Sequence, residues 1–196
     1  DTSLRLKNMI IKGKISPKLK KQIEEIITTK HTTSWVVRSS SIGEDSHTSS
    51  FADLHESYIN VKGMKKLLEK IKLVWASLYS DGALMYRTEL GLNLNSMSMA
   101  VIIQEFLPGE SSGICFSINP LNSKQSIVEA VFGLNQALVD GDINPYRWFI
   151  SRKNGNIVNH KKSMITQKMI TARNGVELIN IKLKEDITPL QDSDVY

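Results

Sequence analysis

The sequence predicts an α+β fold, in which helices and strands are mixed without a strict strand–helix–strand alternation. Three observations predict it. Apolar residues recur at helical spacing between residues 64 and 79, and β-branched and aromatic residues concentrate between residues 33 and 38. An Asn-Gly pair at residues 154–155 separates two short apolar runs, which is typical of a β-hairpin.

The first half of the chain is expected to hold three helices and two strands. Ser16 and Pro17 mark a helix start, since serine caps free N–H groups and proline fits the first helical turn. Ile23, Ile26 and Ile27 then form an apolar stripe that predicts a packing face. The expected elements are a helix after Pro17, a strand at 33–38, a long polar loop from Ser39 to Ser57, a short strand at 59–61, and helices at 64–79 and 81–90.

The second half is expected to consist mainly of strands. Residues 99–106 and 112–118 predict a strand pair around the turn signal Pro108-Gly109. A strand at 127–132 and a short helix at 135–139 follow, and the polar tail from Thr171 holds one possible strand. The remaining expected elements are a turn at 140–142, a hairpin of residues 147–150 and 157–160, and the tail strand at 176–181.

Composition limits the possible classes of function. The net charge of +5 suits an anionic ligand, but aromatic residues are not interleaved with the basic groups, so nucleic-acid binding is not expected. Cys115 lies in an apolar run and is expected to be a core residue, and a single cysteine favours a reducing cytoplasm. No apolar stretch is long enough to span a membrane. The missing initial methionine suggests a piece of a longer protein.

Arg38 is the first candidate binding residue. It ends the predicted strand and precedes three serines, so guanidinium, hydroxyl and backbone N–H donors are expected side by side. Phosphate oxygens favour this combination. A surface arginine followed by turn-forming serines is the alternative interpretation of the same pattern.

Two other segments contain residue types that can bind a metal ion or a nucleotide base. His47 and His55 occur in the polar loop, but neither belongs to a zinc-ligand spacing, so no metal site is predicted. Residues 101–107 form an apolar strand that runs through Gln104 to Leu107, a place where main-chain groups can bind a nucleotide base. A core strand with a polar end is the alternative interpretation.

The order of several short blocks carries a resemblance to a known family. The blocks are VVRSSSIGED at 36–45, SSFA at 49–52, YINV at 58–61, VWASLYSD at 74–81, Tyr-Arg at 86–87, VIIQ at 101–104, SGICFSINP at 112–120 and EAVFGL at 129–134. In this order they resemble the ATP-grasp nucleotide-binding domain of phosphoenolpyruvate synthase, pyruvate phosphate dikinase and rifampin phosphotransferase. The resemblance is good from residue 34 to 150 and faint in the lead-in at 1–33 and in the hairpin and tail at 151–196.

The resemblance implies an ATP site and assigns roles to five residues. Arg38 would contact the phosphates, the loop with Asp53 and Ser57 would close over them, and Gln104 with Leu107 would hold the adenine. Asp53 stands where the family has glycine and adds a carboxylate near a polyanion, which is unfavourable unless a cation neutralises it. The family's Gly-Glu pair after Gly-Leu also reads Asn135-Gln136 here, and its Pro-Asp reads Pro145-Tyr146.

The resemblance further implies a larger parent protein. Such a parent uses ATP and Mg²⁺, carries the phosphoryl group on a histidine of a separate domain, and passes it to pyruvate held by another domain. The ligands of Mg²⁺ and the ATP-binding lysine have no match here, so this chain alone is expected to be inactive. An antibiotic phosphotransferase with the same ATP domain and a degenerate, non-catalytic nucleotide-binding module are the alternatives.

Overall fold

The computed structural model of the protein describes residues 2–41, 45–46, 49–50, 55–91, 93, 98–173, 175–182 and 187–195. It confirms a mixed α/β chain whose named sheets are built from antiparallel pairs. The contacts divide the chain into two compact units, Asp1–Phe106 and Leu107–Tyr196. The sequence predicted other boundaries, at residues 33 and 150, because the family resemblance is good only between them. Those boundaries stay a prediction.

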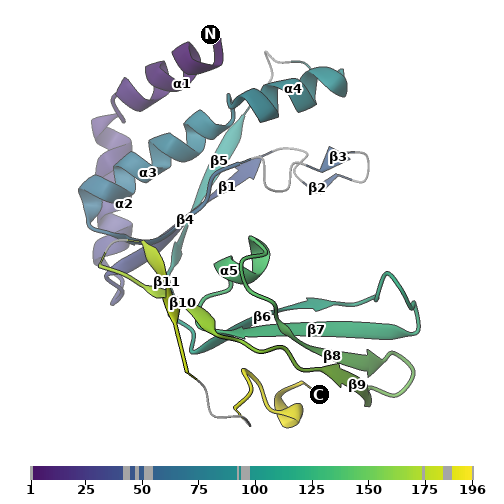
Figure 1. Ribbon diagram of the computed structural model, residues 1–196. Helices are drawn as coiled ribbons and strands as arrows, with labels where there is room; N and C mark the ends of the chain where they lie inside the picture. Colours follow the sequence, from purple (N-terminus) through teal and green to yellow (C-terminus); the bar gives the residue numbers. More distant parts are fainter. Residues whose placement is uncertain are drawn as a thin grey trace. The chain divides into compact units, whose positions relative to one another are not determined.

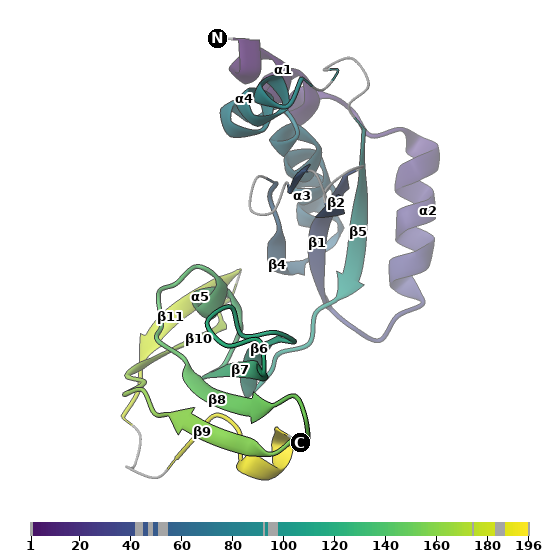
Figure 2. The same cartoon turned by 90° about the vertical axis from the view of Figure 1, so that its right-hand side faces the viewer.

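The first unit is built on a three-stranded antiparallel sheet in the order β4-β1-β5. Strand β1 is therefore the central strand, with a neighbour on each side. Helices α2 and α3 lie against one face of this sheet, and no helix among the described elements covers the other face (Figures 1 and 2). The bounds are α1 Thr2–Lys12, α2 Pro17–Thr28, β1 Ser34–Ser41, β2 Asp45–Ser46, β3 Ser49–Ser50, β4 Tyr58–Lys62, α3 Met64–Ser77, α4 Asp81–Glu89 and β5 Met99–Glu105.

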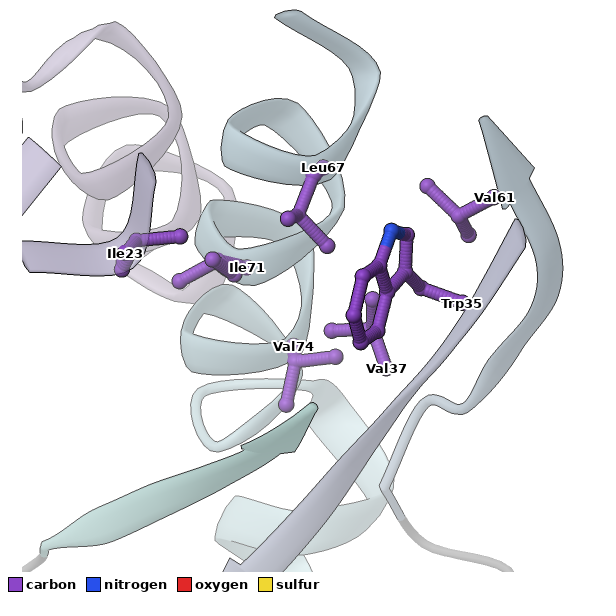
Figure 3. Close-up of a cluster of buried hydrophobic side chains, with 7 residues drawn as sticks. All are labelled: Ile23, Trp35, Val37, Val61, Leu67, Ile71 and Val74. Carbon is purple, nitrogen blue, oxygen red and sulfur yellow. The ribbon is translucent and has the colours of Figure 1, made fainter. Parts of the chain in front are cut away.

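The covered face of the sheet forms the core of the first unit. Alternate residues of β1 point toward α3, and Trp35 and Val37 are buried there. Figure 3 shows them beside Leu67, Ile71 and Val74, which come from successive turns of α3. Each fully buried aliphatic side chain contributes about 1.5–3 kcal/mol, so this face holds the helices to the sheet.

The expected helices are confirmed, with one error. The Ser16 side chain accepts a hydrogen bond of 3.2 Å from the Leu19 N–H, as the start signal predicted. Ile23 is buried, but Ile26 is 62% exposed, so the predicted packing face was too wide. Helix α1 was not specifically predicted. It is attached to α3 by the Lys72 ammonium, which donates to the Ile11 carbonyl at 2.5 Å.

The prediction that residues 39–57 form one long loop is wrong in part, because several of these residues lie in strands. Strand β1 continues through Ser41 because β5 pairs with it along its whole length, from Trp35 opposite Glu105 to Ser41 opposite Met99. The two-residue strands β2 and β3 also pair within the predicted loop. Hydrogen bonding to a neighbouring strand outweighs the low strand propensity of serine here.

The second unit contains a four-stranded sheet in the order β6-β7-β8-β9 and a two-stranded sheet of β10 and β11. The predicted hairpin is confirmed, since β8 pairs with β9 across Asn154-Gly155. The predicted pair of residues 99–106 with 112–118 is wrong, because β5 pairs with β1 and β6 pairs with β7. The bounds are β6 Ser111–Phe116, β7 Gln125–Phe132, α5 Gln136–Val139, β8 Tyr146–Ser151, β9 Ile157–Lys161, β10 Gln167–Thr171, β11 Val176–Asn180 and η2 Asp192–Asp194.

The core of the second unit centres on Trp148, which is almost completely buried. Its indole N–H donates to the carboxylate of Asp192 at 2.8 Å, which attaches the 3₁₀ helix η2 to strand β8. Cys115, expected in the core, is exposed. Cys115 lies in β6, which is an edge strand among the described strands because it pairs only with β7.

Candidate functional site

Arg38 lies on the open face of the central strand of the first unit. Because Trp35 and Val37 point into the core, the alternating residues Val36, Arg38 and Ser40 belong to the opposite face. Arg38 is exposed, and no carboxylate of the described residues lies within salt-bridge distance of its guanidinium. The strand therefore presents an uncompensated, planar set of donors on an accessible face.

Gln104 shares that open face. In the β1–β5 register Arg38 lies opposite Ile102, and Val36 lies opposite Gln104. Gln104 is thus the diagonal neighbour of Arg38, roughly 7–8 Å away in standard sheet geometry. Both side chains are exposed, and Ile102 between them is 47% exposed. The sheet therefore places a cation, an amide and an apolar side chain side by side.

Ser57 immediately precedes strand β4, on the other side of β1 from β5. Tyr58, the first residue of β4, pairs with Val37, which is the neighbour of Arg38 in β1. Ser57 is exposed and lies just beyond the paired part of β4. The chain therefore enters the sheet at Ser57 next to the pair that precedes Arg38.

The two other predicted site residues are not placed with these three. Asp53 lies outside the described residues. Leu107 is the first residue of the second unit and is 80% exposed. Of the predicted site residues that the structure describes, Arg38 and Gln104 share the open face of the first unit, and Ser57 immediately precedes β4.

A depression of about 470 Å³ lies at the end of the same two strands. Ser40 and Ala100 are cross-strand partners there, two residues beyond Arg38 and Ile102. Same-face residues in a strand are roughly 6–7 Å apart, so Ser40 and Ala100 extend the open face past Arg38. Ser41 is buried and Met99 packs against the core, so these two lining residues belong to the covered face. Ser98 and Ala100 were not predicted as site residues. The only sequence signal for Ser98 is its hydroxyl, and Ala100 has none. The depression is lined by Ser40, Ser41, Ser98, Met99 and Ala100.

The chemistry of this face is that of an anion site. Arginine donates paired hydrogen bonds to phosphate or carboxylate oxygens, and serine hydroxyls add weaker donors. Within the described ranges, His, Cys, Asp and Glu side chains form no group of three or more able to hold a metal ion. No described helix is long and apolar enough to cross a membrane.

The altered Gly-Leu-Asn-Gln block lies in the second unit. Asn135 precedes α5 in a right-handed helical conformation, so the glycine that the family has there is not required by the backbone. Gln136 is the exposed first residue of α5. Gly133, by contrast, has a positive φ of 77°. Its carbonyl accepts a hydrogen bond of 2.6 Å from the Ser112 hydroxyl.

Comparison with known proteins identifies relatives along nearly the whole chain. Residues 1–195 match the family described as "Pyruvate phosphate dikinase, AMP/ATP-binding domain". The chain is 34% identical to a phosphoenolpyruvate synthase of Aeropyrum pernix over 80% of its own length and 19% of that protein. It is 38% identical to a "Probable phosphoenolpyruvate synthase" of Archaeoglobus fulgidus over 67% of the chain and 18% of that protein. A rifampicin phosphotransferase of Bacillus cereus is 41% identical over 55% of the chain and 13% of that protein.

Proposed function

Because the chain belongs to the family of pyruvate phosphate dikinase AMP/ATP-binding domains, we propose that it binds ATP on the open face of the β4-β1-β5 sheet. The β1–β5 register, in which Arg38 and Gln104 are diagonal neighbours on one face, supports this proposal, as does the pairing of Val37 with Tyr58, the residue after Ser57. The fold is then of the ATP-grasp type. The mixed α/β architecture with antiparallel sheets supports that assignment.

Each residue of the face has a separate role in this proposal. Arg38 binds the phosphates through its fork of N–H donors. Ser57 covers them, and the serines around the depression add hydroxyl donors. Gln104 donates to or accepts from the adenine edge. The roles predicted for Asp53, which lies outside the described residues, and for Leu107, which begins the second unit, stay predictions. Mg²⁺ bound with the nucleotide would supply positive charge beside its phosphates.

Binding of ATP is tested by thermal unfolding of the full-length polypeptide that carries this chain. A ligand that binds only the folded state adds about 2.7 kcal/mol of stability at 100 times its Kd. We therefore expect Tm to rise steadily with ATP at constant MgCl₂ and ionic strength, while an equal addition of NaCl leaves it unchanged. A Tm that stays constant at millimolar ATP would contradict the proposal and favour a scaffolding module without catalysis, which Asp53, Asn135 and Gln136 suggest.

The parent reaction follows from the relatives and is part of the proposal. The chain spans about a fifth of the length of the two phosphoenolpyruvate synthases, so other parts of such a protein would supply the remaining steps. The parent would convert ATP, pyruvate and water to AMP, phosphoenolpyruvate and phosphate by way of a phosphohistidine on a carrier domain. The 196 residues alone are expected to bind ATP without converting it.

The identity to a rifampicin phosphotransferase supports a second candidate acceptor. The two candidates differ in the compound that ATP consumption requires. We expect AMP formation by the full-length protein to depend on pyruvate and to be unaffected by rifampicin. Formation of AMP with rifampicin and not with pyruvate would assign the second activity instead.

A further inference from the structure

The block of residues 74–81, at the end of α3, contains a buried serine that the proposed site does not use. Ser77 is 5% exposed. Its hydroxyl donates to the Val74 carbonyl at 2.7 Å and accepts from the backbone N–H of Glu56 at 3.2 Å. Alanine is a better helix former and leaves no polar group to bury. The hydroxyl is therefore best explained by its second partner, Glu56, which lies outside the helix.

Glu56 immediately precedes Ser57, and the residue after Ser57 is also attached to α3. The ammonium group of Lys70 lies 4.1 Å from the centre of the Tyr58 ring. The Tyr58 ring also packs against the buried core. Burial, together with the charge and hydrogen bonding of the Glu56 carboxylate, raises the pKa of Tyr58 to about 12. Ser57 is thus exposed between two residues that contact the same helix.

These contacts hold the backbone on both sides of Ser57. Ser77 binds the N–H of Glu56 and Lys70 contacts the ring of Tyr58, while Tyr58 also pairs with Val37 of β1. If the Ser77 hydroxyl is removed, the Glu56 N–H loses this partner, and the backbone immediately before Ser57 loses its hydrogen bond to α3.

We propose that Ser77 is a positioning residue of the nucleotide site, which sets Ser57 over the terminal phosphates by binding the backbone of Glu56. This inference rests on the proposed ATP-binding function. It also gives a role to residues 74–81, a block that contacts no nucleotide in the proposed site. Ser77 acts through Ser57, so its effect should be confined to ligands that reach Ser57.

The test compares ATP with AMP, which lacks the two terminal phosphates, by equilibrium titration of the full-length polypeptide. Ser77→Ala is expected to weaken ATP binding about three- to tenfold, the size of one lost neutral hydrogen bond, and to leave AMP binding unchanged. In a Ser57→Ala background the effect on ATP should disappear, because coupled residues are not additive. Ser77→Cys keeps the side-chain volume with a weak acceptor, and it provides the same comparison if Ser77→Ala does not fold.

The matched control is Ser80→Ala in the same block. Ser80 accepts a bond of 3.2 Å from the Ala83 N–H and caps α4, so its loss should lower Tm and change neither affinity. Equal weakening of ATP and AMP by Ser77→Ala, or an undiminished effect in the Ser57→Ala background, would overturn the inference and leave the ATP site intact. A wild-type protein that binds neither nucleotide would overturn the proposed function and this inference with it.

Discussion

Replacing Arg38 with alanine is expected to weaken ATP binding about 10- to 100-fold. Hydrogen bonds to charged groups contribute roughly 1.5–3 kcal/mol, and each 1.4 kcal/mol corresponds to about a factor of ten in Kd. Arg38 is exposed and has no acidic partner among the described residues, so the free protein should lose little stability. Titration of ATP into the full-length variant, with its Tm measured in the absence of ligand, separates the two effects.

Two variants make the Arg38 result specific. Arg5→Ala removes the same charge from the exposed surface of α1 and should leave ATP affinity unchanged. Arg38→Lys keeps the charge but loses the planar fork, and an intermediate affinity is expected. If Arg38→Ala binds ATP as tightly as the wild type, the open face of β1 is not the phosphate site.

The residue types of this site were predictable from the sequence, and their arrangement was not. An arginine followed by serines indicated an anion site, and the resemblance added Gln104 and Ser57. The register of β1 with β5 is what makes Arg38 and Gln104 diagonal neighbours, although 65 residues separate them in the chain. No local pattern fixes such a register, because it depends on which faces of the two strands are buried together.

The errors in the predicted fold share a physical cause. Residues 99–106 and 112–118 are close in sequence and were expected to pair, but the partner of β5 is β1, far away in the chain. The same pairing extends β1 into serines whose propensity favours a turn. Hydrogen bonds between strands that are far apart in the chain determine both the partner of β5 and the length of β1. The propensities of single residues carry no information on such pairing.

The elements that were predicted correctly carry their own local signals. Ser16 caps α2, and the Asn154-Gly155 turn joins β8 to β9. Helix α1 lacks such signals, since its first turn has no acidic residue and Ser3 is its only buried residue. Its position depends on Lys72 and on a bond of 2.7 Å from the Ser3 hydroxyl to the Tyr79 carbonyl. The spacing of apolar residues along the sequence does not predict tertiary contacts of this kind.

Among the described glycines of the second unit, Gly133 combines a positive φ with a close approach of another backbone segment. A Cβ atom added there would lie 2.1 Å from the Met169 carbonyl oxygen, and φ is +77°. That oxygen accepts a hydrogen bond of 2.8 Å from the Leu134 N–H, which joins this segment to β10. A side chain at Gly133 would therefore strain its own backbone and displace the partner of its neighbour.

Gly133→Ala is expected to lower the free energy of unfolding by about 3–6 kcal/mol, the sum of a left-handed backbone of roughly 1–2 kcal/mol, overpacking of roughly 1–3 kcal/mol and a lost hydrogen bond of about 1 kcal/mol. Two other glycines separate these contributions. Gly141 has a φ of +79° with nothing within 4 Å of an added Cβ, whereas Gly113 has no positive φ but would place a Cβ 2.2 Å from the Glu129 carbonyl oxygen. In urea unfolding of the full-length protein we therefore expect Gly133→Ala to cost the most and Gly141→Ala the least. Equal costs for Gly133→Ala and Gly141→Ala would mean that the approach of Met169 contributes nothing, and that the link from this block to β10 is not a source of stability.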